Sequence, residues 1–182
     1  ALLNVLGVDL SALDFRARAA IEALCDEVLV LREDADELRD ALDEAVSLAD
    51  NDALCPVFNR RAFEREIRRE IALAARFRTP LSMIYIDLDH FKQVNDVFGH
   101  AAGDEVLIRI AELLLRHTRE TDIVGRLGGD EFGIVLAQAN VDDSRLKAEQ
   151  LTHEVDQLVV RSDGDDAHPG VRIGASCGVV EW

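Results

Sequence analysis

The sequence predicts an α+β sandwich with a mainly antiparallel central sheet, preceded by a long N-terminal coiled-coil helix. A heptad pattern of apolar residues runs through residues 11–50. Beyond it, helical and β-rich segments follow in the order α, β, αα, ββ, α, β. Two β-rich segments adjoin across a short connection with two glycines, which is typical of an antiparallel hairpin. We therefore divide the chain into a lead-in (1–10), a coiled-coil helix (11–50) and a globular domain (51–182).

The N-terminal helix carries apolar residues at alternating spacings of three and four, which is the seam of a coiled coil. The seam residues are Ile21, Leu24, Val28, Leu31, Ala35, Leu38, Leu42, Ala45 and Ala49. In a parallel pair, Glu27 would face Arg32 of the partner subunit, and Asp34 would face Arg39 of the partner subunit. The pattern favours a parallel homodimer. A single amphipathic helix packed on its own domain is the alternative.

The globular domain shows one helix, one buried strand, two helices, a hairpin, a helix and a final strand. The expected elements are a helix at 59–77, a strand at 81–88, helices at 91–97 and 106–114, strands at 123–127 and 132–136, a helix at 143–160, a loop at 161–170 and a strand at 171–180. In the hairpin, Gly128 and Gly129 permit positive φ, and the tip carries Asp130 and Glu131.

The net charge of −16 restricts the choice of partners. Residues 1–52 alone hold 14 Asp and Glu against 4 Arg. Such a chain repels the phosphates of nucleic acids and anionic lipids, so we expect no nucleic acid and no membrane contact. A nucleotide with magnesium is acceptable because the metal brings its own charge. The odd number of cysteines, without metal-ligand spacing, favours a reducing cytoplasm.

Two blocks of residues carry the chemistry. The first covers residues 87–104 and reads DLDHFKQVNDVFGHAAGD, and the second covers residues 128–132 and reads GGDEF. Asp87 ends a buried strand and Asp130 lies at a hairpin tip, so the two carboxylates would repel each other without a cation between them. Magnesium prefers such hard oxygen ligands. The alternative is that Asp87 and Asp89 cap the next helix and Asp130 is an ordinary turn residue.

Together the two blocks resemble the GGDEF family of bacterial diguanylate cyclases, which join two GTP molecules into cyclic di-GMP. The resemblance extends over residues 50–180. It implies a palm-like nucleotidyl-cyclase fold, a cofactor of Mg²⁺ (or Mn²⁺), and attack of a 3′ hydroxyl on an α-phosphate with pyrophosphate leaving. Each domain would hold one GTP, so two domains must face each other. A parallel coiled coil would raise their effective concentration.

The resemblance also assigns catalytic and metal-binding roles. It implies that Asp87, Asp130 and the backbone carbonyl of Leu88 bind the metal ions. Asp130 would in addition help to deprotonate the attacking hydroxyl, and Glu131 would have a supporting catalytic role.

Substrate binding is implied by the same resemblance. Asn95 and Asp104 would hydrogen-bond the guanine, since an amide and a carboxylate match its donor and acceptor groups. Backbone amides of His90, Phe91 and Lys92 would bind phosphates at a helix N-terminus. The Lys92 side chain either assists there or is an ordinary surface lysine.

Arg119 and Asp122 match the RxxD inhibitory site of the family, where cyclic di-GMP binds as product. A guanidinium and a carboxylate together suit the edges of guanine. The alternative is an arginine that ends a helix and an aspartate that precedes a strand.

The sequence departs from the family at two places. Cys55 and Pro56 stand where the family usually has Thr and Gly, which predicts a stiffer joint after the helix. The family usually continues beyond the last strand into a helix whose basic residues contact phosphates, and this sequence ends at Trp182. We expect a cytoplasmic diguanylate cyclase under product inhibition. The alternative is a non-catalytic receptor that binds GTP or cyclic di-GMP.

Overall fold

The computed structural model describes residues 14–160 and 170–182, and the chain divides into two compact units, Ala1–Ser47 and Leu48–Trp182. The described part of the first unit lies in one helix, α2 (Phe15–Asp50), whose last residues belong to the second unit. Asp14 caps this helix, because its Oδ1 accepts a hydrogen bond from the Ala17 N–H at 2.8 Å. The long N-terminal helix predicted from the heptad pattern is therefore present.

The apolar seam of α2 is uncovered in the single chain. Leu24, Leu31, Leu38 and Leu42 are 61%, 59%, 71% and 62% exposed. A regular stripe of large exposed apolar side chains is typical of an interaction surface. The parallel pairing of two such helices stays a prediction.

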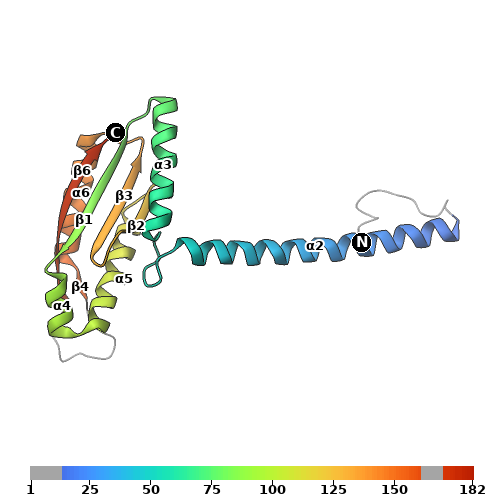
Figure 1. Cartoon of the computed structure of the whole chain (residues 1–182), viewed down its shortest axis with the longest axis horizontal. Coiled ribbons are helices and arrows are strands. Elements are labelled where there is room, and N and C mark those ends of the chain that lie inside the picture. Colours follow the sequence, from blue (N-terminus) through green and yellow to red (C-terminus); the bar gives the residue numbers. More distant parts are fainter. Residues whose placement is uncertain (1–13, 161–169) are drawn as a thin grey trace. The chain divides into compact units, whose positions relative to one another are not determined.

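The second unit is built on a four-stranded sheet. Its strands are β1 (Leu81–Asp89), β2 (Ile123–Arg126), β3 (Glu131–Ala137) and β6 (Gly174–Glu181). They lie in the order β2-β3-β1-β6, and each neighbouring pair is antiparallel (Figure 1). This confirms the mainly antiparallel sheet predicted from the sequence.

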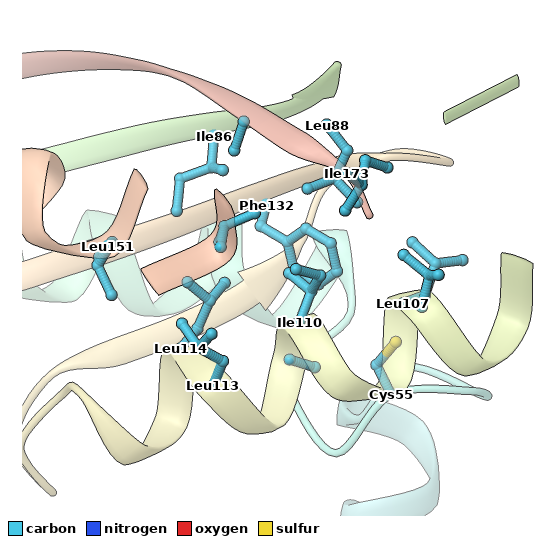
Figure 2. Close-up of a cluster of buried hydrophobic side chains, with 14 of the residues drawn as sticks. Cys55, Ile86, Leu88, Leu107, Ile110, Leu113, Leu114, Phe132, Leu151 and Ile173 are labelled. Carbon is cyan, nitrogen blue, oxygen red and sulfur yellow. The ribbon is translucent and has the colours of Figure 1, made fainter. Parts of the chain in front are cut away.

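Four helices pack against the sheet, which separates two cores. They are α3 (Arg60–Phe77), α4 (Phe91–Phe98), α5 (His100–Arg116) and α6 (Val141–Gln157). The larger core joins the sheet to α5 and α6, and Figure 2 shows Leu107, Ile110 and Leu114 of α5 facing Ile86 and Phe132 of the sheet. Because successive strand residues point to opposite faces, the same strands also contribute to a smaller core against α3.

Phe63 anchors α3 to the hairpin strands. Gly125 and Gly133 are paired directly across β2 and β3. A Cβ atom at either position would lie 2.6 Å from the Phe63 ring, which is closer than atoms can pack. The two glycines thus form a slot for this ring, and the slot fixes α3 over the hairpin that carries Asp130.

The structure corrects the predicted end of the last helix and the course of the final strand. The helix predicted for 143–160 ends at Gln157, and Val159–Val160 form a short strand, β4, paired with β5 (Val171–Arg172). Leu158 has extended backbone angles, and the β-branched valines after it favour a strand. The predicted final strand is therefore divided into β5 and β6, and the loop predicted at 161–170 lies outside the described residues except for Gly170.

The segment between α2 and α3 is tied to the hairpin. Asn59 caps α3 by accepting from the Ala62 N–H at 2.9 Å, and its Nδ2 donates to the carbonyl oxygen of Ala49 at 2.8 Å. Phe58 exchanges backbone hydrogen bonds with Val124 and Arg126 of β2.

Within residues 14–160 and 170–182, no helix combines the length and apolar character that crossing a membrane would need.

Candidate active site

The two sequence blocks meet at one end of the sheet. Asp87 near the end of β1 lies opposite Glu131, the first residue of β3. One step further, the Leu88 N–H donates a hydrogen bond to the carbonyl oxygen of Asp130 at 3.1 Å. This main-chain bond brings together residues that are separated by more than forty positions in the sequence. The predicted proximity of Asp87 to Asp130 is therefore observed.

The carboxylates at this end of the sheet influence one another. Partial burial raises the pKa of Asp87, and the nearby negative charges of Asp130, Glu131 and Asp89 raise it further. A divalent cation would relieve this repulsion. Among the described residues, no three His, Cys, Asp or Glu side chains form a ready metal cage. Two carboxylates with a backbone carbonyl fit Mg²⁺ nevertheless, because Mg²⁺ commonly completes its octahedron with substrate phosphates and water.

The two glycines in the turn between β2 and β3 have backbone conformations that differ from the expected ones. Neither Gly128 nor Gly129 has positive φ, although the sequence predicted it. The connection is longer than a two-residue turn, with Leu127 N–H donating to the Glu131 carbonyl oxygen at 2.8 Å. At position 128 a Cβ atom would overlap Glu131 Oε2. Glycine is needed there for the close approach of the Glu131 carboxylate.

Arg126 holds this turn in place, a role that the sequence analysis missed. Its Nε donates to the Gly128 carbonyl oxygen at 3.1 Å and its Nη2 to the Gly129 carbonyl oxygen at 2.8 Å. Its Nη1 forms a salt bridge with Asp52 Oδ1 at 3.1 Å. The sequence could have indicated this role by position, because Arg126 is the last residue of the strand that leads into the turn.

Asp52 is itself surrounded by donors. Burial alone would raise its pKa, but the backbone N–H groups of Cys55 and Leu54 and the Arg126 guanidinium outweigh burial and keep the pKa below its usual value. Burial raises the pKa of the adjacent Cys55 thiol to about 11, so this thiol stays protonated at neutral pH. Cys55 is a packing residue in the structure.

The residues predicted to bind guanine lie on two consecutive helices. Asn95 belongs to α4 and Asp104 to α5, and Gly99, with φ of 83°, separates the helices. A Cβ atom at Gly103 would overlap Asn95 Oδ1. The Asn95 side chain therefore rests against the residue that precedes Asp104, which brings the two predicted guanine contacts close together.

The predicted phosphate-binding amides lie at the start of α4. His90 precedes the helix in the left-handed region, with φ of 58°. Phe91 is 8% exposed and packs in the core, so only its backbone is available to a ligand. The Lys92 side chain is exposed. A helix N-terminus next to Asp87 is suited to a phosphate that shares a metal with that carboxylate.

Arg119 and Asp122 lie at the opposite end of β2 from the Gly128 turn. The Arg119 N–H donates to Asp122 Oδ2 at 2.8 Å. Both residues line a cavity of about 380 Å³, together with His117, Gln138 and Lys147. The structure thus groups the two residues of the RxxD motif and places a second cation, Lys147, beside them, for which the sequence offered no signal.

Comparison with known proteins agrees with this geometry. The sequence profile described as "Diguanylate cyclase, GGDEF domain" matches residues 49–182. The chain belongs to the GGDEF family of diguanylate cyclases. It is 39% identical over 126 residues to the diguanylate cyclase DosC of Escherichia coli (strain K12), covering 69% of this chain and 27% of DosC. It is 38% identical over 173 residues to the diguanylate cyclase TpbB of Pseudomonas aeruginosa (strain UCBPP-PA14), covering 88% of this chain and 40% of TpbB.

Solved GGDEF structures share the fold. The coiled coil and GGDEF domain of DgcB from Caulobacter crescentus, in complex with c-di-GMP, matches with a TM-score of 0.78 and 25% identity, over 88% of this chain and 83% of that one. The active GGEEF domain of a diguanylate cyclase from Vibrio cholerae matches with a TM-score of 0.61 and 36% identity, over 71% and 77%. This GGDEF chain spans less than half the length of DosC and TpbB.

Proposed function

We propose that this chain is a diguanylate cyclase, which condenses two GTP molecules into cyclic di-GMP with release of two pyrophosphates. The observation that carries the proposal is the hydrogen bond from the Leu88 N–H to the Asp130 carbonyl oxygen, at 3.1 Å. It joins the two sequence blocks of the family at one site. Membership of the GGDEF family further supports the reaction.

The carboxylates at this site have different proposed roles. Asp87, Asp130 and the Leu88 carbonyl would hold Mg²⁺ or Mn²⁺. When bound, the ion supplies a Lewis acid for the α-phosphate and lowers the pKa of the 3′ hydroxyl. Asp130 accepts the proton of that hydroxyl. Glu131 supports the site through its negative charge, which favours occupancy by a cation. In the metal-free chain the same charge raises the pKa of Asp87.

Residues of α4 and α5 bind and orient GTP in this proposal. The Asn95 amide and the Asp104 carboxylate read the guanine edge, and the amides at residues 90–92 bind phosphate oxygens. The Asn95 side chain is held by its contact with Gly103. These contacts set the position of the base relative to the phosphates, which orientation-dependent catalysis requires.

Two copies of the chain are needed, because each hydroxyl attacks the phosphate bound to the other domain. The exposed seam of α2 supports a parallel homodimer. Replacing Leu31 and Leu38 together by Asn should give monomers in sedimentation experiments and reduce activity at low protein concentration. Both side chains are more than half exposed in the single chain, so the domain should stay folded.

Product inhibition is proposed for the cavity at Arg119 and Asp122. Replacing Arg119 by Ala should raise the concentration of cyclic di-GMP that halves the rate, with little change in the uninhibited rate. Unchanged inhibition would remove this assignment.

The experiment that tests the cyclase is incubation of the purified chain with GTP and Mg²⁺, with products followed by chromatography. Cyclic di-GMP and pyrophosphate should appear, and Asp130→Asn should abolish them without unfolding the domain. Full activity of folded Asp130→Asn would refute its catalytic role. Binding of GTP or cyclic di-GMP without turnover would indicate a receptor instead.

A further inference from the structure

Helix α3 has a uniformly cationic outer face in a strongly acidic chain. An α-helix turns by about 100° per residue, and the side of α3 opposite the buried Phe63 ring therefore holds arginines separated only by Ala72 and Ala75. We call these exposed arginines the arginine face, and they are Arg61, Arg65, Arg68, Arg69 and Arg76. The chain as a whole has a net charge of −16, so this face contrasts with most of the surface.

The domain neutralises only part of the charge on the arginine face. Arg65 is paired with Asp50 at 2.7 Å, whereas Arg68 and Arg69 have looser contacts with glutamates of α3, at 4.0 and 3.6 Å. The side chains of Arg68 and Arg69 remain 79% and 73% exposed. Arg61 and Arg69 each lie one helical turn from Arg65, and like charges at this spacing repel each other. An anionic surface on this face would relieve that repulsion.

Helix α2 carries the opposite charge on the side away from its apolar seam. With the seam at heptad positions a and d, the outward positions b, c and f between residues 26 and 44 contain no arginine or lysine. Exposed carboxylates on these positions form what we call the acidic face, and they are Asp26, Glu33, Asp36, Glu37, Asp40 and Glu44. Within residues 14–160 and 170–182, none of these six carboxylates forms an ion pair.

The two faces match in length as well as in sign. At about 1.5 Å per residue, the acidic face extends over about 27 Å and the arginine face over about 23 Å. Ala72 and Ala75 leave room between the arginines for the close approach of another helix. In a coiled coil, positions b, c and f point away from the paired helix, so pairing along the seam leaves the acidic face free.

We propose that the arginine face of α3 binds the acidic face of α2 in a second copy of the chain, outside the stalk pair. The inference does not depend on the cyclase reaction. Nucleic acids and anionic bilayers fit the arginine face less well, because the acidic remainder of the surface repels their extended negative charge. A single helix with six carboxylates presents its charge only where the arginines lie.

Sedimentation velocity of the whole purified chain tests the proposal. We expect the mass in about 0.1 M salt to rise with protein concentration to twice the mass in about 1 M salt, because screening shortens the range of the attraction from about 10 Å to about 3 Å. A mass that is the same at both salt concentrations, or that does not rise with protein concentration, would overturn the proposal.

A charge reversal locates the contact on α3. Arg68→Glu combined with Arg69→Glu should weaken the association in about 0.1 M salt by roughly tenfold or more, because like charges then face each other. Arg65 is left in place to keep its pair with Asp50. The matched control is Arg145→Glu combined with Arg172→Glu, which makes the same change of net charge at two exposed arginines of α6 and β5. Equal loss in the control would overturn the assignment to α3.

A charge exchange tests whether α2 supplies the other side. Asp36→Arg combined with Asp40→Arg changes outward positions of α2 and should also prevent the association. When all four substitutions stand in one chain, the charges are complementary again, and the association should return. A folded fourfold variant that stays unassociated would overturn the pairing of the two faces. Binding of the wild type to phosphatidylglycerol vesicles without self-association would overturn it in favour of a membrane. None of these readouts requires turnover of GTP.

Discussion

Asp52 and Arg126 form a salt bridge, 3.1 Å between Oδ1 and Nη1, that links the segment after α2 to the turn between β2 and β3. The Arg126 and Asp52 side chains are only 16% and 20% exposed. The remaining nitrogens of Arg126 are bonded to the carbonyl oxygens of Gly128 and Gly129. One planar guanidinium thus connects two parts of the domain that are distant in sequence.

Replacing Arg126 by Lys should impair both stability and activity. An ammonium group cannot satisfy three acceptors in this plane, so a partly buried Asp52 loses its partner. We expect a loss of roughly 1–3 kcal/mol in the free energy of unfolding, measured with urea, and a lower kcat. Arg109→Lys is the matched control, because its pair with Glu105 on α5 is more exposed and should contribute under about 1 kcal/mol. Equal losses in the two variants would contradict the role of Arg126.

The same salt bridge should give a defined pH dependence. The pKa of Asp52 is lowered in the folded chain from its usual value of 3.8. Its stabilising effect is therefore complete above that value and is lost as the pH falls through the lowered pKa. We expect Asp52→Asn to be less stable than the wild type at pH 7, with the difference shrinking below pH 3.8. A difference independent of pH in urea unfolding would show that the charge of Asp52 contributes nothing.

Replacing Asp87 by Asn should abolish activity and stabilise the metal-free domain. The pKa of Asp87 is raised in the folded chain, so its charged form is disfavoured there and costs stability above that pKa. We expect a higher melting temperature than the wild type at pH 7 without Mg²⁺, and a smaller increase than in the wild type on adding Mg²⁺ with GTP. The control is Glu149→Gln, an exposed residue of α6, which should change neither. Destabilisation by Asp87→Asn would argue against repulsion at the site.

Replacing Gly103 by Ala should weaken GTP binding without unfolding the domain. The new methyl group would overlap Asn95 Oδ1 and displace that side chain from the base. Alanine also favours a helix over glycine by about 1 kcal/mol, which offsets much of the strain. We expect the GTP dissociation constant, measured calorimetrically, to rise about tenfold for the loss of one hydrogen bond. Gly178→Ala is the control, since a Cβ atom there meets nothing within 4 Å.

The elements, and the meeting of Asp87 with Asp130, could be predicted because their signals are local. The nearly continuous apolar run of residues 81–88 indicated a buried strand, and Asp87 and Asp130 stand in short motifs. The strand at Val159–Val160 was missed because a helical pattern precedes it without a break, and its pairing with β5 is a tertiary contact.

The contacts around the turn could not be predicted for a different reason. Arg126 binds backbone carbonyl oxygens and a carboxylate 74 positions away, and neither leaves a pattern in the sequence. The glycines were expected to permit positive φ, whereas in the structure Gly128 leaves room for the Glu131 carboxylate.

The main-chain hydrogen bond between Leu88 and Asp130 makes no use of the side chain at position 130. The scaffold therefore tolerates either acidic residue there, and a glutamate would leave the hairpin docked against β1. A domain with GGEEF in this place is active in the Vibrio cholerae relative. The fold requires only the backbone at this position, whereas the proposed chemistry requires a carboxylate. Aspartate and glutamate can therefore replace each other there without a change in the turn.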